Sequence, residues 1–244
     1  MNKIDARIST VDSPAIGKRK TILLVLVSIV FIAIVAGLFA LWPAPPPPPA
    51  AFPSPNGYES LAQGGMLVQT LSSDFAKMDQ EQLRGLVDAN SNALQVARIG
   101  LAEKSRVPLE FTEQYMTNHM QELARMKTLA YAFLAEGRLA EMEQRTNDAV
   151  RAYMDAARLG VSVRRGGPLI DEFVGFASES MGQSQLQNFV HTLDAKTSAE
   201  FARELEALDA DKESWAEVLQ NETRWVPRRT LRFEVQNRGA NHCG

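Results

Sequence analysis

A run of 22 uncharged residues near the N-terminus, Thr21 to Trp42, constrains this chain more than any other feature. As an α-helix the run would extend about 33 Å, which matches the ~30 Å hydrocarbon core of a bilayer. Three basic residues at 18–20 precede it directly, and the first charge beyond it is Glu59. The positive-inside rule therefore predicts a transmembrane helix at 21–42, with residues 1–20 in the cytoplasm and the rest across the membrane.

A cleaved signal peptide is the alternative interpretation of this run. The apolar region of a signal peptide is about 7–15 residues long and ends at a small-x-small cleavage site. Here the run is longer, and Trp42-Pro43 follows it where cleavage would have to occur. The sequence therefore favours an uncleaved anchor, which makes the lipid bilayer an expected partner through residues 21–42.

A proline-rich tether at 43–57 follows the anchor. The segment Pro43 to Pro55 contains eight of the twelve prolines, five of them consecutive at 45–49. Such a run forms a stiff polyproline II helix that rises about 3.1 Å per residue, so the tether would hold the next domain up to about 45 Å from the bilayer.

The charge of the remaining chain argues against one class of partner. Beyond residue 20 the chain carries 21 basic and 27 acidic residues, a net charge of −6. Phosphate contacts supply most of the affinity of nucleic-acid-binding proteins, so we expect no nucleic-acid partner. The single cysteine, Cys243, excludes an intrachain disulfide, and with His242 alone it makes a poor metal site.

Apolar spacing predicts a helical domain over 58–226, followed by a polar tail at 227–244. We expect a first helix from Tyr58 to Met78 and a second that begins at an Asp79–Gln82 capping box. A fourth helix is expected from Thr146 to a glycine stop at Gly160. Separate short helices follow Pro168 and span 185–193, and a Thr197–Glu200 capping box opens a last helix that runs beyond Leu219.

The third helix has the clearest pattern, a stripe spaced by three or four residues over seven turns. Its members are Tyr115, His119, Leu123, Met126, Ala130, Phe133, Gly137 and Ala140. We interpret His119 as a core histidine in preference to a catalytic one. Glu110 and Glu113 lie near His119, but no further ligand completes a metal site, and we predict no cofactor and no metal.

Two segments repeat at an offset of 60 residues. Ala93–Glu110 and Tyr153–Ile170 share the pattern Ala-Arg-x-Gly and, eight residues later, Pro-Leu. We interpret each copy as a helix, a glycine stop and a loop before the next helix. Repeated helical units of this kind are typical of stacked-hairpin solenoids.

One hairpin resembles a tetratricopeptide repeat over about 34 residues. The residues that carry the resemblance are Phe133, Gly137, Ala149, Tyr153 and Ala156, at that family's spacings. Ala140 replaces the usual tyrosine, and Val161 stands where proline is usual. The resemblance implies an all-α domain of helical hairpins, with these five residues forming the packing contacts of the repeat.

Longer strings resemble uncharacterised bacterial proteins with an N-terminal anchor and a helical domain. They include NGYESLAQGG, LVDANSNALQVARIGL and RLGVSVRRGGPLIDEFVGFA, and the similarity covers most of 56–185. This resemblance implies a bacterial, membrane-anchored protein, and it brings no established activity with it. Together with the positive-inside rule, it leads us to expect an inner-membrane protein with its helical domain in the periplasm.

No catalytic motif occurs in the sequence: there is no GxxxxGK[ST], HExxH, GxSxG or CxxC. The loop Arg164–Gly167 offers an anion cradle, although an ordinary interhelical loop is the commoner explanation. The sequence therefore predicts a membrane-anchored interaction or scaffold module, with a protein or peptide partner and no catalytic activity of its own. The alternative is a cell-envelope enzyme, acting for example on the cell wall, whose site no motif reveals.

Overall fold

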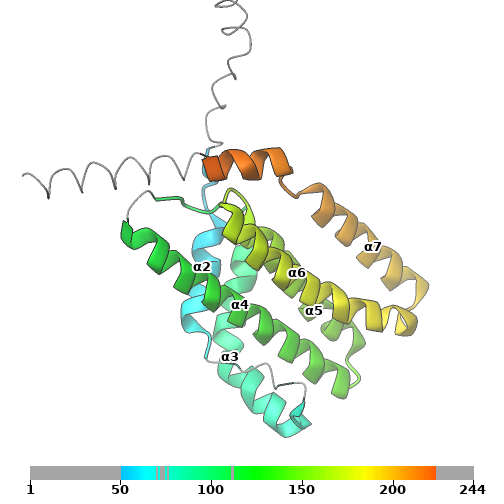
Figure 1. Cartoon of the computed structure of the whole chain (residues 1–244). Coiled ribbons are helices and arrows are strands. Elements are labelled where there is room, and N and C mark those ends of the chain that lie inside the picture. The colour runs from blue at the N-terminus through cyan, green and yellow to red at the C-terminus, as the bar shows by residue number, and fades with distance from the viewer. Residues whose placement is uncertain (1–50, 70, 72–74, 76, 111–112, 224–244) are drawn as a thin grey trace, which may run out of the picture. The chain divides into compact units, whose positions relative to one another are not determined.

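The computed structural model of the chain describes residues 51–69, 71, 75, 77–110 and 113–223. Every regular element in these ranges is helical, which confirms the all-α prediction (Figure 1). None of the helices described there is long and apolar enough to cross a bilayer. The predicted transmembrane helix at 21–42, the N-terminal tail, most of the tether and the tail at 227–244 lie outside the described residues.

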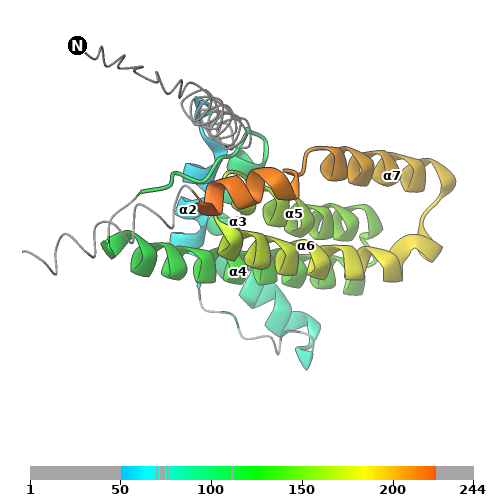
Figure 2. The same ribbon diagram turned by 45° about the horizontal axis from the view of Figure 1, so that its top comes forward.

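Six α-helices and one short 3₁₀ helix make up the named elements of the described part. They are α2 (Gly57–Leu67), α3 (Gln80–Leu101), α4 (Glu113–Met142), α5 (Thr146–Arg164), α6 (Leu169–Phe189), η2 (Val190–Thr192) and α7 (Ala195–Ala210). A further α-helical segment, which carries no label, covers residues 215–223. In Figures 1 and 2, α4, α5 and α6 run side by side, and the contacts between these helices agree with that view.

The first helix is shorter than the sequence predicted. The side chain of Asn56 caps α2 by accepting a hydrogen bond from Tyr58 N, and the helix ends at Leu67, not at Met78. Beyond it, Gln69 N donates to Asn90 Oδ1 at 2.7 Å, so the backbone finds its partner on α3 and leaves the helical path. Asn56 and Gly57, placed in the tether from the sequence, are buried in this domain.

Of the two capping boxes that the sequence predicted, one is confirmed and the other is wrong. The capping box at the start of α3 is confirmed, with both the Asp79 and Gln82 side chains making the reciprocal hydrogen bonds. The box predicted at Thr197 is wrong, because α7 begins three residues earlier with Asp194 as its cap, and Asp194 accepts from Thr197 N. The last helix also divides, since α7 ends at Ala210 and a separate helical stretch covers 215–223.

The stripe predicted on the third helix faces the core of the domain. On α4, Leu123, Met126, Ala130 and Phe133 are at most 1% exposed. His119, on the same stripe, is also only 1% exposed, as expected of a core histidine. This helix therefore supplies one long wall against which α2, α3, α5 and α6 pack.

The end predicted for the second helix is confirmed to within one residue, and the glycine stop predicted for the fourth helix is wrong. α3 ends at Leu101, directly after Gly100, whereas α5 continues through Gly160 as far as Arg164. Both glycines mark close helix crossings. A Cβ on Gly100 would lie 2.6 Å from Gly57 O on α2, and a Cβ on Gly160 would lie 2.4 Å from Gly175 O on α6.

The repeated Ala-Arg-x-Gly segments are therefore repeated packing faces. Gly64 of α2 lies against Ala97 of α3, and Gly182 of α6 lies against Ala157 of α5. The partner helix comes before α3 in the first copy and after α5 in the second. The two short helices that the sequence predicted in this region are one continuous helix, α6. Its first half crosses α5 at Gly175 and its second half crosses α5 at Gly182.

Candidate functional site

A groove follows the exposed side of α5. Its first part is a cavity of about 570 Å³ between α5 and the adjoining parts of α3 and α4. Its second part, about 350 Å³, lies between α5 and α7. Arg151 and Arg158 line both parts, and Arg158 also borders a further hollow of about 560 Å³ along α7. The three hollows therefore adjoin one another at Arg158.

The far wall of the groove is α7, which packs loosely. None of its residues is buried, and Phe201, Leu205 and Leu208 are only partly covered by the core. Charged contacts hold this wall in place: Arg158 donates to Glu204 Oε2 at 2.8 Å. Arg165, at the end of α5, pairs with Asp211 just beyond α7. Because apolar packing does not close the space between α5 and α7, the groove stays open there.

Arg98 from α3 forms the floor of the first part of the groove. It donates to the carboxylates of Glu136 and Asp155, the latter at 2.8 Å, and its guanidinium lies 5.3 Å from the Phe133 ring centroid. Burial alone would lower the pKa of Arg98, but the hydrogen bonds to Glu136 and Asp155 raise it overall. Its positive charge is therefore fixed, and each of its three guanidinium nitrogens already donates a hydrogen bond to a carboxylate of the domain.

Arg151 differs from the other three arginines of the groove. Its side chain is 73% exposed, and its nearest carboxylate oxygen, Asp148 Oδ1, is 3.6 Å away. Arg145 and Arg158 each donate at least two hydrogen bonds to carboxylates, whereas Arg151 makes none among the described residues. Arg151 is thus the arginine of this groove whose donors remain available to a ligand.

The loop proposed as an anion cradle already holds anions of this chain. Gly166, in the left-handed region at φ +78°, donates its N–H to Glu213 Oε2 at 2.9 Å. Leu169 N, at the start of α6, donates to Glu222 Oε2 at 2.9 Å. Arg164 is buried and pairs with Glu179 at 2.8 Å. The cradle therefore fastens the 211–223 region to the end of α5.

A buried polar cluster lies where α2, α4 and α6 meet. His119 Nε2 is 2.8 Å from Asp171 Oδ1 and 3.0 Å from Asp171 Oδ2. Glu122 Oε2 is 3.9 Å from His119 Nδ1, and the Tyr115 ring stacks on the imidazole at a centroid distance of 4.9 Å. The hydroxyl of Tyr58 is buried beside Glu122 and makes no hydrogen bond of ordinary geometry.

Burial raises the pKa values of three side chains in this cluster, Asp171, Glu122 and Tyr58. It raises the pKa of Asp171, an effect that the hydrogen bond from His119 opposes. Burial also raises the pKa of Glu122 and, with the charges of Glu122 and Asp171, the pKa of Tyr58. The His119 and Asp171 side chains are 1% and 0% exposed, so a substrate cannot reach this pair in the described conformation.

The metal-ligand candidates from the sequence do not come together in the described residues. Glu110 is exposed, and the carboxylate that His119 contacts is that of Asp171. In the described part of the chain, no group of three His, Cys, Asp or Glu residues is placed to hold a metal ion. His242 and Cys243 lie outside that part.

The five residues that carry the tetratricopeptide resemblance all lie in the interior, on α4 and α5. Phe133, Ala149, Tyr153 and Ala156 are at most 1% exposed. A Cβ on Gly137 would lie 2.4 Å from Tyr153 Cε1, so the glycine allows the tyrosine ring to lie flat against α4. The Tyr153 hydroxyl donates to Glu141 Oε1 at 2.6 Å.

The groove and the buried pair were both missed by sequence reasoning. Arg98 and Asp155 are 57 residues apart, and His119 and Asp171 are 52 apart. The signal that was present is the repeated Ala-Arg-x-Gly pattern, which places Arg98 and Arg158 at equivalent positions of α3 and α5. Comparison with known proteins adds nothing to this picture, since no protein-family model, curated protein or solved structure matches the chain.

Proposed function

We propose that this protein is a membrane-anchored interaction module that binds a protein or peptide partner in the groove along α5. The observation that carries the proposal is the groove itself, which consists of three adjoining hollows lined by side chains from α3, α4, α5 and α7. Helical hairpin domains use such extended concave surfaces to bind other proteins.

Arg151 gives the groove a point of specific contact. A guanidinium with free donors binds carboxylates in bidentate fashion, and arginine is enriched among the residues that dominate binding energy. The apolar side chain of Phe201, partly exposed on α7, lies in the same part of the groove, whereas Met154 behind it is fully buried. We therefore expect a partner segment that places a carboxylate or a backbone carbonyl on Arg151 and an apolar side chain beside it.

Charge reversal at this residue tests the proposal. Membranes from cells that express the intact chain would be crosslinked, and co-purified proteins quantified by mass spectrometry. We expect Arg151→Glu to lower recovery of a reproducible partner at least about tenfold, the loss that corresponds to about 1.4 kcal/mol. The matched control is Lys127→Glu, the same charge change on an exposed part of α4 outside the groove. Equal recovery from both variants would contradict the proposal.

The proposed topology has its own test. The chain contains one cysteine, Cys243, which serves as a built-in reporter. In the proposed orientation the N-terminus is cytoplasmic and the helical domain extracytoplasmic, on the periplasmic side of a bacterial inner membrane. A membrane-impermeant maleimide should then label Cys243 in spheroplasts without detergent. Labelling that appears only after the membrane is dissolved would reverse the orientation.

A further inference from the structure

The charges of α6 lie on the side that faces the domain, and its outer side has none. The helix contains three charged residues, Asp171, Glu172 and Glu179, and their side chains are only 0%, 12% and 4% exposed. Each has a basic partner within the domain: His119 for Asp171, and Arg164 for both glutamates at 3.7 Å and 2.8 Å. Lys212 also binds Glu179, at 2.9 Å.

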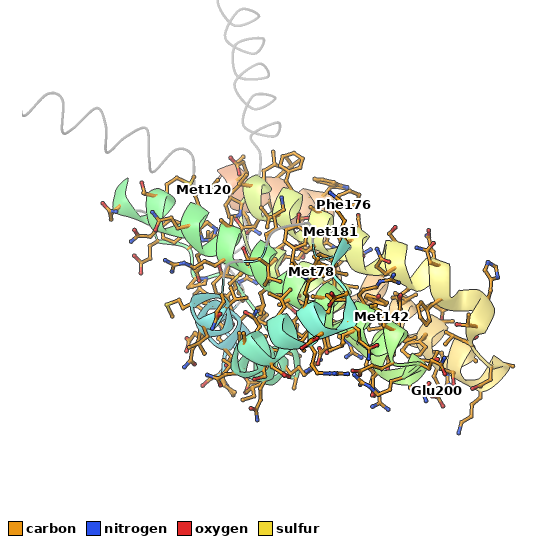
Figure 3. The ribbon with its side chains drawn as sticks, turned by 90° about the horizontal axis from the view of Figure 1, so that it is seen from below. Met78, Met120, Met142, Phe176, Met181 and Glu200 are labelled. Atoms are coloured by element: carbon orange, nitrogen blue, oxygen red, sulfur yellow. The ribbon has the colours of Figure 1, made fainter. Side chains whose placement is uncertain are left out.

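Aromatic side chains occupy the outer side of the same helix. Phe173 and Phe176 are 61% and 64% exposed, and Figure 3 shows Phe176 on the outer side of α6. The rest of this outer face is small or polar, with Ala177, Ser180 and Ser184 followed by Gln187 and Asn188. An ordinary surface helix has the opposite arrangement, with its charges in solvent. Exposed aromatics on a surface without charges are typical of the core of a protein interface.

We propose that this outer face of α6 binds a second copy of the same chain in an antiparallel, two-fold arrangement. Beyond residue 20 the chain is acidic, with a net charge of −6, so two copies carry like net charge and repel each other wherever charged surfaces meet. The outer face of α6 is uncharged, and two copies can meet there without placing like charges together. Antiparallel pairing also aligns the helix dipoles favourably.

The distribution of side-chain size along α6 fits this pairing. A two-fold axis near Ser180 places Phe176 of one copy opposite Ser184 of the other. The same axis places Phe173 opposite Gln187. Each bulky residue then meets a smaller one, which is the complementarity that close helix packing requires. A parallel pair would instead set phenylalanine against phenylalanine and serine against serine.

The expected dimer is weak. A helix of 21 residues is about 31 Å long and about 10 Å wide, so one face supplies roughly 300 Å² per copy, below the ~800 Å² of a standard interface. Association is therefore expected to depend on concentration, and the intact chain in its native membrane is the proper sample.

Cysteine crosslinking in membranes tests the arrangement. In a Cys243→Ser background, Ser180→Cys should form a disulfide-linked dimer of two differently tagged copies, because this residue lies near the axis. A mixture of Phe176→Cys and Ser184→Cys chains should crosslink between the two variants, whereas a mixture of Phe176→Cys and Ser91→Cys should not. Ser91 is an exposed serine on α3 and serves as the control position.

Introducing a charged residue on the outer face of α6 provides a second test of the dimer. Phe176→Glu or Ser184→Glu should reduce the Ser180→Cys crosslink at least about tenfold, because two buried like charges would face the interface. Met66→Glu is the matched control, an equally exposed apolar residue on α2. Equal crosslinking at Ser91 and Ser180, no self-crosslink along α6, or adducts only with a different protein would each overturn the proposal. Loss of the dimer would leave partner recovery through Arg151 unchanged.

Discussion

His119 Nε2 lies 2.8 Å from Asp171 Oδ1, and both side chains are almost completely buried. The contact joins the start of α4 to the start of α6. A buried pair of this kind tolerates the loss of both members better than the loss of one, since a single partner is left unpaired in the interior.

A double-mutant cycle measures this coupling. Asp171→Ala and His119→Ala should each lower the free energy of unfolding by about 3–5 kcal/mol. The double variant should lose clearly less than the sum, because neither partner remains unpaired. Chemical denaturation of the four chains gives the coupling energy. Losses that simply add would show that the two side chains act independently.

The raised pKa of Glu122 predicts a pH dependence of stability. An acid whose pKa is higher in the folded state binds its proton more tightly there. The stability it contributes is present below the unfolded pKa of about 4.3 and is lost as the pH rises through the folded pKa. Relative to the native chain, Glu122→Gln should therefore gain stability as the pH rises from 4 to 7.

Glu143→Gln provides the control of opposite sign for that experiment. Hydrogen bonds from Arg84 and Arg145 lower the pKa of Glu143. Its stabilising contribution is therefore present above the unfolded pKa and is lost as the pH falls through the folded pKa. Denaturation curves at pH 4 and 7 should show the two variants diverging in opposite directions, and curves that move together would refute the assignment.

Glycine substitutions distinguish helix crossings from exposed helix positions. Gly160→Ala should destabilise the domain by about 1–3 kcal/mol, because its Cβ would lie 2.4 Å from Gly175 O. Gly85→Ala, at an exposed site on α3 with no atom within 4 Å of the added Cβ, should stabilise by about 0.5–1 kcal/mol. Thermal unfolding of both variants checks the prediction, which fails if their effects have the same sign.

Two buried tyrosines should respond differently to loss of the hydroxyl group. The Tyr58 hydroxyl makes no hydrogen bond of ordinary geometry, so Tyr58→Phe should leave stability unchanged or raise it by up to about 1 kcal/mol. The Tyr153 hydroxyl donates to Glu141 at 2.6 Å, so Tyr153→Phe should lower stability by about 1 kcal/mol. The two unfolding midpoints give the comparison directly, and a larger loss at Tyr58 would contradict it.

Local sequence patterns correctly predicted the elements in which the spacing of apolar residues matches the residues that are buried. The stripe on α4 follows a helical period because one side of that helix faces the core throughout, and the Asp79 capping box depends only on residues three apart. The glycine stop predicted at Gly160 failed for a physical reason. A glycine can end a helix or allow another helix to approach, and only the position of α6 decides which occurs.

Long-range pairing accounts for most of what the sequence did not predict. α6 has weak amphipathic character because Asp171 and Glu179 face inward toward His119 and Arg164, partners that no local window contains. The groove likewise depends on how α7 lies beside α5, which contacts such as Arg158–Glu204 determine. The residues of both features were visible in the sequence, but their proximity was not.

The central claim, that the groove along α5 binds a partner, is tested most directly by site-specific photocrosslinking in intact cells. A photoreactive amino acid would replace Asn147, an exposed residue that lines the groove between α5 and α7, and in a second chain Lys127. We predict a discrete, reproducible adduct from position 147 that is absent from position 127 and is lost when Arg151→Glu is added. No adduct at 147, or the same adducts from both positions, would contradict the claim.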